Sequence, residues 1–160
     1  MKNRKINFKL LIVCLILVYA TAFIGSIFTS SEVNSNWYNS VKPSITPPGY
    51  IFPIVWNILF FLIAISLYLS WNSAKNKSQK IKIASVFAIN LFLNAFWSYL
   101  FFTLKNPVAS FIELNFIWIS ILAMIYTTYK INKNSAYFLI PYFAWVSFAG
   151  ILNYLIMIKL

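Results

Sequence analysis

Polar and aromatic side chains that interrupt long apolar segments are the residues of this chain best suited to chemistry. Asn90, Asn94, Trp97 and Phe101 recur at i, i+4, i+7 and i+11, so they share one stripe of a helix. A polar group inside an apolar span costs free energy in lipid unless it faces protein or a cavity. The stripe therefore either bonds neighbouring helices together or lines a cavity.

Two tryptophans lie deep inside their apolar segments. At a rise of about 1.5 Å per residue, Trp56 and Trp145 are expected about 10–15 Å below the nearest helix end. Tryptophans that anchor a protein at the membrane surface lie at the level of the lipid headgroups. A deeper indole needs an acceptor for its N–H, which favours a lined cavity. Ala149 and Leu152 follow Trp145 on the same helical stripe. Asn57, beside Trp56, has the simpler interpretation of a hydrogen bond between helices.

The composition argues against several kinds of site. The 160 residues include no His, which is the commonest metal ligand and general base, and a single Cys, Cys14. One Cys excludes an internal disulfide and C-x-x-C chemistry, so no metal or redox site is predicted. Glu32 and Glu113 are the only acids, which disfavours a paired-carboxylate hydrolase. Glu113 is the only acid within an apolar segment, where it is either a hydrogen-bonded packing residue or part of a proton-coupled transport path.

The elements that position these residues are membrane-spanning helices. The chain is 61% hydrophobic and 9% charged, against about 45–50% and about 25% in soluble chains. Five apolar segments reach the roughly 17–25 residues that a helix needs to cross a bilayer. They cover about residues 10–28, 50–71, 83–104, 108–129 and 136–158. An odd number without polar–apolar alternation disfavours a barrel. We expect an all-α integral membrane protein, a five-transmembrane-helix bundle forming a single domain over residues 1–160.

The net charge of +11 is interpreted through its distribution along the chain. The first segment is longer than the apolar region of a signal peptide, so we expect it to be retained as a helix. With five crossings, ten basic residues fall on one side: Lys2, Arg4, Lys5, Lys9, Lys75, Lys77, Lys80, Lys82, Lys130 and Lys133. Three fall on the other: Lys42, Lys105 and Lys159. This bias predicts a cytoplasmic amino terminus and contact with lipid headgroups, not with nucleic acid.

The connection over residues 29–49 is the longest and contains three prolines, Pro43, Pro47 and Pro48. Proline fixes φ and lacks an N–H, so the segment should be stiff. It is either a plain rigid connector or a cover whose aromatic pair, Trp37 and Tyr38, closes one mouth of the bundle.

Several motifs together resemble the translocator protein / tryptophan-rich sensory protein (TspO) family, also known as peripheral-type benzodiazepine receptors. They are Trp37-Tyr38, Lys42-Pro43-Ser44, Pro47-Pro48, Trp56, Leu93-Asn94 with Trp97, and the run from Pro141 to Tyr154. The resemblance covers essentially the whole chain, from Gly25-Ser26 in the first helix onward. The complete set of motifs in this order is highly specific to the family, whereas no single motif is.

The resemblance implies a protein of the bacterial cell membrane, usually a homodimer, that binds protoporphyrin IX or a related tetrapyrrole and needs no other cofactor. Animal members also bind cholesterol and benzodiazepine-type ligands. The implied ligand-binding residues are Tyr38, Trp56, Asn94, Trp97, Trp145, Ala149 and Leu152. In bacterial relatives the tryptophans matching Trp56 and Trp145 are implicated in light-dependent oxidative breakdown of the porphyrin, which makes them the candidate catalytic residues.

The sequence departs from the family pattern in its long connection. Ile45 stands where relatives often have Trp, and the stretch from Trp37 to Lys42 is one residue short, so the cover could differ in shape and in drug affinity. The cholesterol pattern is only loosely retained and carries little weight. Without His the familiar haem ligand is absent, so we expect metal-free protoporphyrin, with propionates that reach toward Lys42. Binding, photo-oxidation, and transport or sensing of porphyrins stay open as functions.

Overall fold

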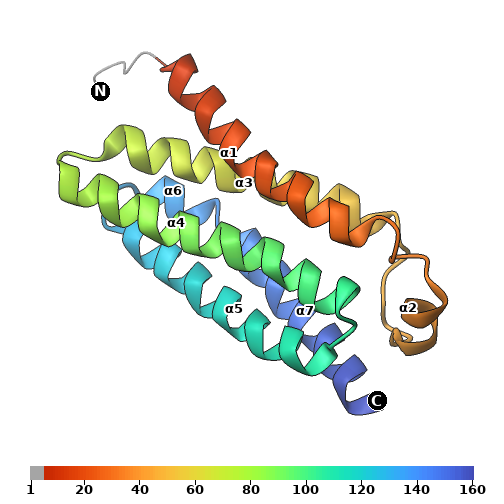
Figure 1. Ribbon diagram of the computed structural model, residues 1–160. Coiled ribbons are helices and arrows are strands. Elements are labelled where there is room, and N and C mark those ends of the chain that lie inside the picture. The colour runs from red at the N-terminus through yellow and green to blue at the C-terminus, as the bar shows by residue number, and fades with distance from the viewer. Residues whose placement is uncertain (1–5) are drawn as a thin grey trace.

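The computed structural model describes residues 6–160, which form a bundle of helices (Figure 1). Five spans are long and apolar enough to cross a membrane: Phe8–Thr29, Ile51–Ser73, Lys77–Thr103, Pro107–Tyr129 and Lys133–Lys159. They correspond to α1 (Phe8–Thr29), α3 (Ile51–Ser73), α4 (Lys77–Ser98) with the π-helical turn η1 (Tyr99–Thr103), α5 (Pro107–Tyr129), and α6 (Lys133–Tyr137) with α7 (Ile140–Lys159). Residues 6–160 contain no strand. The predicted all-α fold with five membrane-crossing helices is confirmed.

The start of α4 differs most from the predicted boundaries, which placed it near residue 83 and left 73–82 as a loop. The helix begins at Lys77 because the Asn76 side chain caps it, accepting a hydrogen bond of 2.9 Å from the Gln79 backbone N–H. Lys and Gln also favour helix. Apolarity therefore indicates only the part of the helix that lipid covers.

The last span is interrupted, although the sequence predicted one helix over 136–158. The short α6 (Lys133–Tyr137) ends before Phe138, and α7 begins at Ile140. Pro141 explains the break, because proline lacks the backbone N–H that would bond to the Tyr137 carbonyl in a continuous helix. It is tolerated at the start of α7, where the N–H would have no partner in the helix.

The long connection between α1 and α3 holds the short helix α2 (Asn36–Val41), which the sequence did not predict. The Ser35 side chain caps α2 by accepting a hydrogen bond of 3.1 Å from the Tyr38 backbone N–H. Figure 1 shows α2 at one end of the bundle, beside the carboxyl ends of α1 and α4. We call residues 30–50 the lid and this end the lid end.

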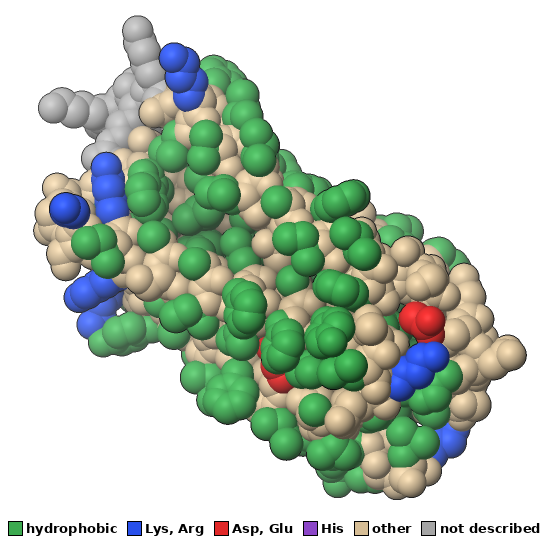
Figure 2. All heavy atoms as spheres, viewed as in Figure 1, with side chains coloured by type: hydrophobic (Ala, Val, Ile, Leu, Met, Phe, Trp, Pro, Cys, Tyr) green, Lys and Arg blue, Asp and Glu red, His purple; other side chains and the backbone are tan. Residues whose placement is uncertain are grey.

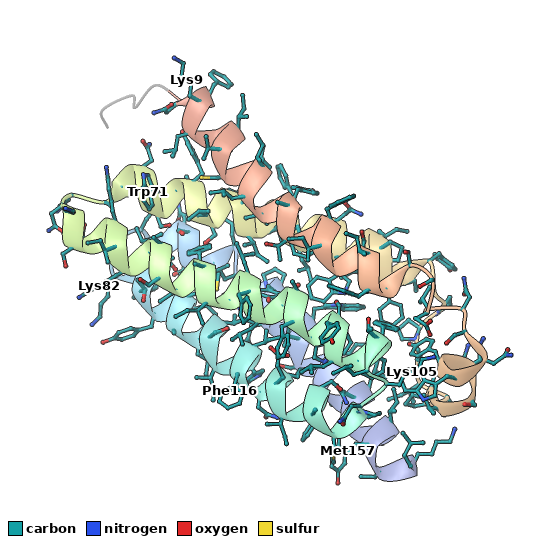
Figure 3. All side chains as sticks on the ribbon, in the orientation of Figure 1. Lys9, Trp71, Lys82, Lys105, Phe116 and Met157 are labelled. Atoms are coloured by element: carbon teal, nitrogen blue, oxygen red, sulfur yellow. The ribbon has the colours of Figure 1, made fainter. Side chains whose placement is uncertain are left out.

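Most described lysines lie at the opposite end, where α3 meets α4 and α5 meets α6. Lys9 and Lys82 mark it in Figure 3, and Lys105 marks the lid end. The predicted separation of basic residues along the bundle is seen, although Lys2, Arg4 and Lys5 lie outside the described residues. We call this the lysine-rich end.

Candidate functional site

A cavity of about 430 Å³ lies beneath the lid and is enclosed mainly by α1, α3, α4 and α7. Its size falls within the range of small-molecule sites. All seven residues that the sequence predicted as ligand-binding line it: Tyr38, Trp56, Asn94, Trp97, Trp145, Ala149 and Leu152. Residues from four separate elements therefore meet around one space.

Aromatic rings make the wall formed by α3 and α7. Phe52, Trp56 and Phe60 repeat every four residues on α3, so they share one face of that helix. Trp56 stacks on Phe60, with ring centroids 5.4 Å apart, and Phe52 meets the edge of Trp145 at 5.8 Å. Trp56 lies five residues into α3, about 8 Å from its start, which is shallower than the sequence suggested. Trp145 lies near the middle of its span.

The indole N–H of Trp145 is buried and has no hydrogen-bond acceptor among the described residues. Other tryptophans within the bundle do have one: Trp118 donates to Ser147 Oγ at 2.9 Å and Trp97 to Asn153 Oδ1 at 3.1 Å. Buried donors are rarely left unpaired in proteins. Trp145 lines the cavity, so this unpaired donor belongs to a side chain of the cavity wall.

A polar network under the cavity explains both asparagines of the predicted stripe. Asn90 is fully buried, donates to Ser120 Oγ at 2.8 Å and accepts from the Tyr142 hydroxyl at 3.2 Å. Asn94 Nδ2 donates to the same hydroxyl at 3.0 Å. Asn90 therefore links helices and lies outside the cavity lining, whereas Asn94 belongs to both the network and the lining. The network fixes the orientation of the Asn94 amide at the cavity wall.

Trp97 contributes a ring face to the cavity, because its N–H is already used by Asn153. Asn153 in turn donates from Nδ2 to the Pro107 carbonyl at 2.9 Å, which ties α4, α5 and α7 together. Asn153 lines the cavity and was not among the predicted site residues. Its position four residues after Ala149 on the same helical face was the signal that could have identified it.

The π-helical turn η1 brings additional aromatic rings to the cavity. In an α-helix, Phe101 would lie on the stripe of Trp97 and Phe102 would point elsewhere. The wider turn, closed by the Leu104 N–H on the Tyr99 carbonyl at 3.0 Å, buries both, and both line the cavity. Such π-helical turns frequently occur at functional sites.

The lid packs on these rings. Tyr38 meets Phe101 and Phe102 at centroid distances of 6.2 and 5.8 Å, and Trp37 meets Phe101 at 5.6 Å. Burial raises the pKa of Tyr38 above its ordinary value, so its hydroxyl keeps its proton and stays a donor near neutral pH. Of the two interpretations of this connection, the contacts favour a cover, and its aromatic pair packs on the rings of η1.

Two lysines fasten the lid to the bundle. Lys105 Nζ lies 3.2 Å from Glu32 Oε2 and 5.9 Å from the centroid of the Trp37 ring. Lys159 Nζ donates to the Ser40 carbonyl at 2.7 Å. Lys105 has a φ of 48°, a left-handed conformation that few residues other than glycine adopt. We call the contacts of Lys105 with Glu32 and Trp37 the latch.

Three residues singled out in the sequence lie away from the cavity. Lys42 is exposed and donates to Asn39 Oδ1 at 2.7 Å, so the expected reach of propionates toward Lys42 finds no support in the lining. Cys14 lies in a groove between α1 and α4. Glu113 is buried, 6% exposed, and neither of its carboxyl oxygens has a partner within residues 6–160. The part of the lining that the structure describes is uncharged.

This arrangement defines an integral membrane protein: five membrane-crossing helices that enclose an aromatic, uncharged cavity under a fastened lid. The sequence pattern of the TspO/MBR family matches residues 12–158. The chain is 37% identical to the Tryptophan-rich protein TspO of Archaeoglobus fulgidus over 151 residues. The aligned region covers 94% of this chain and 96% of the relative. It is 35% identical over 147 residues to the protein of the same name from Chlorobaculum tepidum, covering 92% and 93%. It is 28% identical over 134 residues to the human Translocator protein, covering 82% and 79%. The chain belongs to the TspO/MBR family.

Proposed function

We propose that the cavity binds a metal-free tetrapyrrole of the protoporphyrin type. The observation that carries this proposal is the unpaired, buried N–H of Trp145 in a cavity walled by the rings of Trp56, Trp97 and Phe52. A flat conjugated macrocycle gains from stacking and apolar burial against such rings. The Trp145 N–H can donate to the polar edge or to the π face of such a macrocycle.

The charges around the cavity suggest how such a ligand is oriented. The described lining is uncharged, so the macrocycle belongs inside and the propionates belong at the lid end, where Lys105 and Lys159 lie. Carboxylates would be costly to bury without a partner. The described lining contains neither His nor Cys, because Cys14 lies outside this cavity. Tyr38 is the residue of the lining that could ligate iron, so the separate titration with haem decides between the two ligands.

An absorption titration of the detergent-purified protein with protoporphyrin IX, and separately with haem, tests this proposal. We expect saturable binding of protoporphyrin with a shifted Soret band. Trp145→Phe should weaken it about fivefold, the contribution of one neutral hydrogen bond. Trp118→Phe, at a tryptophan outside the cavity, is the matched control and should bind as the wild type does. No saturable binding, or equal affinity for the Trp145 and Trp118 variants, would contradict the proposal.

A light-dependent oxidative function is supported by the aromatic contacts of Trp56. Its ring centroid lies 6.2 Å from that of Tyr142, whose hydroxyl joins the asparagine network. In this proposal the light-excited porphyrin passes one electron to dioxygen, the oxidant, and the resulting superoxide and porphyrin radical cation combine to oxidise the macrocycle. The indole of Trp56 or Trp145 relays the radical by exchanging an electron reversibly with the porphyrin radical cation. The protein supplies position and excludes bulk water. If a Trp56→Phe, Trp145→Phe double variant bleached bound protoporphyrin at the wild-type rate under light, this role would be excluded.

Transport is the alternative, and the unpaired carboxyl of Glu113 is the observation in its favour. Intramembrane acids often serve proton relays. Flux of protoporphyrin into liposomes should depend on Glu113 if the protein is a transporter, and Glu113→Gln should abolish it. Equal flux with the wild-type protein and with protein-free liposomes would leave binding or sensing as the function.

The setting of the protein follows from the same family membership and charge distribution. We propose that it is a homodimer of a bacterial cell membrane, with the lysine-rich end in the cytoplasm, and that benzodiazepine-type compounds compete for its cavity. Labelling of a Ser40→Cys variant by a membrane-impermeant maleimide in intact cells tests the orientation, with Cys14→Ser as background. Labelling only after cell lysis would contradict it.

A further inference from the structure

A second hollow lies on the outside of the bundle, separate from the cavity. It is a groove of about 790 Å³ between α1 and α4, and from Ala84 to Tyr99 it follows α4 for about 22 Å. The amino-terminal part of α1 stands away from α4, so the groove is wide at the lysine-rich end (Figure 1). Figure 2 shows it with hydrophobic side chains on both walls.

The groove has a floor only near the lysine-rich end. Its α3 lining consists of Leu67 and Trp71, which lie in the last two turns of that helix. The walls there include Ala84 and Ala88, whose small side chains leave space. Val13 and Leu17 on the opposite wall are about half exposed, at 50% and 54%. This part of the groove is therefore an apolar trough that the chain itself does not fill.

Lysines stand at the wide end of the trough. Lys80 lies one turn before Ala84 on the same face of α4, and its Nζ is 5.8 Å from the centroid of the Trp71 ring. Lys9 lies one turn before Val13 on α1. Figure 3 shows Lys9 and Trp71 at the same end of the bundle.

These lysines have no acidic side chain to pair with. The only acids of the chain are Glu32 and Glu113. Glu32 pairs with Lys105 at the lid end, and Glu113 lies two turns from the lid end of α5. Lys9 and Lys80 are both exposed, so their charges are free to pair with an anion from outside the chain.

We propose that this groove is a binding site for an anionic phospholipid. One acyl chain lies in the trough between α1 and α4, and the phosphate lies between Lys9 and Lys80 beside Trp71. Each leaflet contributes about 15 Å of hydrocarbon, half of a core of about 30 Å. The groove follows α4 for about 22 Å, so it is long enough to hold an acyl chain of that length. Basic pockets between membrane helices recognise anionic headgroups in this way. The site is independent of tetrapyrrole binding.

Native mass spectrometry of the detergent-purified protein tests the site. The probe is an equimolar mixture of phosphatidylglycerol and phosphatidylcholine with identical acyl chains. We expect one phosphatidylglycerol retained per chain, about thirtyfold in preference to phosphatidylcholine. This magnitude corresponds to the attraction of two surface lysines to an anionic lipid. A Lys9→Gln, Lys80→Gln double variant should lose the preference.

Matched variants separate the site from general charge attraction. Lys130→Gln with Lys133→Gln removes two lysines of the same end that do not flank the groove, and should keep the preference. Ala88→Phe fills the trough and should prevent retention of the lipid. Ala123→Phe, at an exposed alanine of α5, should not. Thermal melts of each variant show that it is folded.

Three results would overturn the proposal. Equal retention of the two lipids by the wild type would show that the groove does not distinguish the anionic headgroup from the zwitterionic one. Equal loss in the two lysine double variants would show general charge attraction. If Ala88→Phe retained the lipid but turned dimers into monomers in the same spectra, the groove would hold a second copy of the chain.

Discussion

The latch at Lys105 allows a prediction in which two substitutions of one residue give different results. Lys105→Ala removes the ion pair with Glu32 and the contact with the Trp37 ring, but keeps a side chain on a backbone with a φ of 48°. Lys105→Gly removes the same contacts and also relieves the left-handed strain. Both variants should therefore loosen the lid, and only the alanine variant should lose global stability.

The free energy that the latch contributes is estimated from the exposure of the Lys105 and Glu32 side chains. The Lys105 and Glu32 side chains are 42% and 28% exposed, so the pair is worth less than about 1 kcal/mol. The exposed cation–π contact adds about 0.5 kcal/mol. Loss of about 1 kcal/mol in all should make lid opening about fivefold more frequent. The relief of strain in the glycine variant is worth about 1 kcal/mol, or about 2–4 °C in Tm.

Hydrogen exchange of the α2 amides measures lid opening without any ligand. We expect the amides of residues 38–42 to exchange about fivefold faster in both variants. Lys42→Ala is the control, because Lys42 is exposed and bonds only within the lid, and its exchange should match the wild type. Unchanged exchange in both Lys105 variants, or a glycine variant less stable than the alanine variant, would refute the reasoning.

Three further substitutions test the buried polar groups by thermal melts in detergent. Tyr142→Phe leaves the amides of Asn90 and Asn94 without their shared partner, so Tm should fall by about 2–8 °C, corresponding to about 1–2 kcal/mol. An unchanged Tm would show that the network does not stabilise the bundle. Asn153→Ala removes the hydrogen-bond partner of the Trp97 N–H and of the Pro107 carbonyl, so it should lower Tm by a similar amount and also shift tryptophan emission. An unchanged emission spectrum would count against the Trp97 contact. Glu113→Leu removes two buried oxygens without partners and should raise Tm by a few degrees; a fall would indicate that the carboxyl has a partner in the membrane.

Hydropathy and helical spacing were sufficient to predict the spans and much of the site. Apolar runs predicted five membrane-crossing helices because lipid requires long hydrophobic segments. The spacing of Asn94 and Trp97 predicted one face of α4, and both residues do line the cavity. The family resemblance supplied the set of seven lining residues, whose role in binding stays a prediction.

Other features depend on contacts that no local pattern encodes. The π-helical turn that turns Phe102 inward is stabilised by packing against Tyr38, a residue of the distant lid. The unpaired N–H of Trp145 and the partner of the Trp97 N–H depend on which side chains other helices bring close. The early start of α4 depends on a capping asparagine within a polar stretch that hydropathy treats as a loop.

The central claim, that the cavity beneath the lid binds a tetrapyrrole, is tested most directly by a matched pair of substitutions on α1. Ala22 lines the cavity, whereas Ala20 is exposed on the outside of the same helix. In an absorption titration with protoporphyrin IX, Ala22→Phe should lose binding because its ring occupies the cavity, and Ala20→Phe should bind as the wild type does. Equal binding by the two folded variants would contradict the claim.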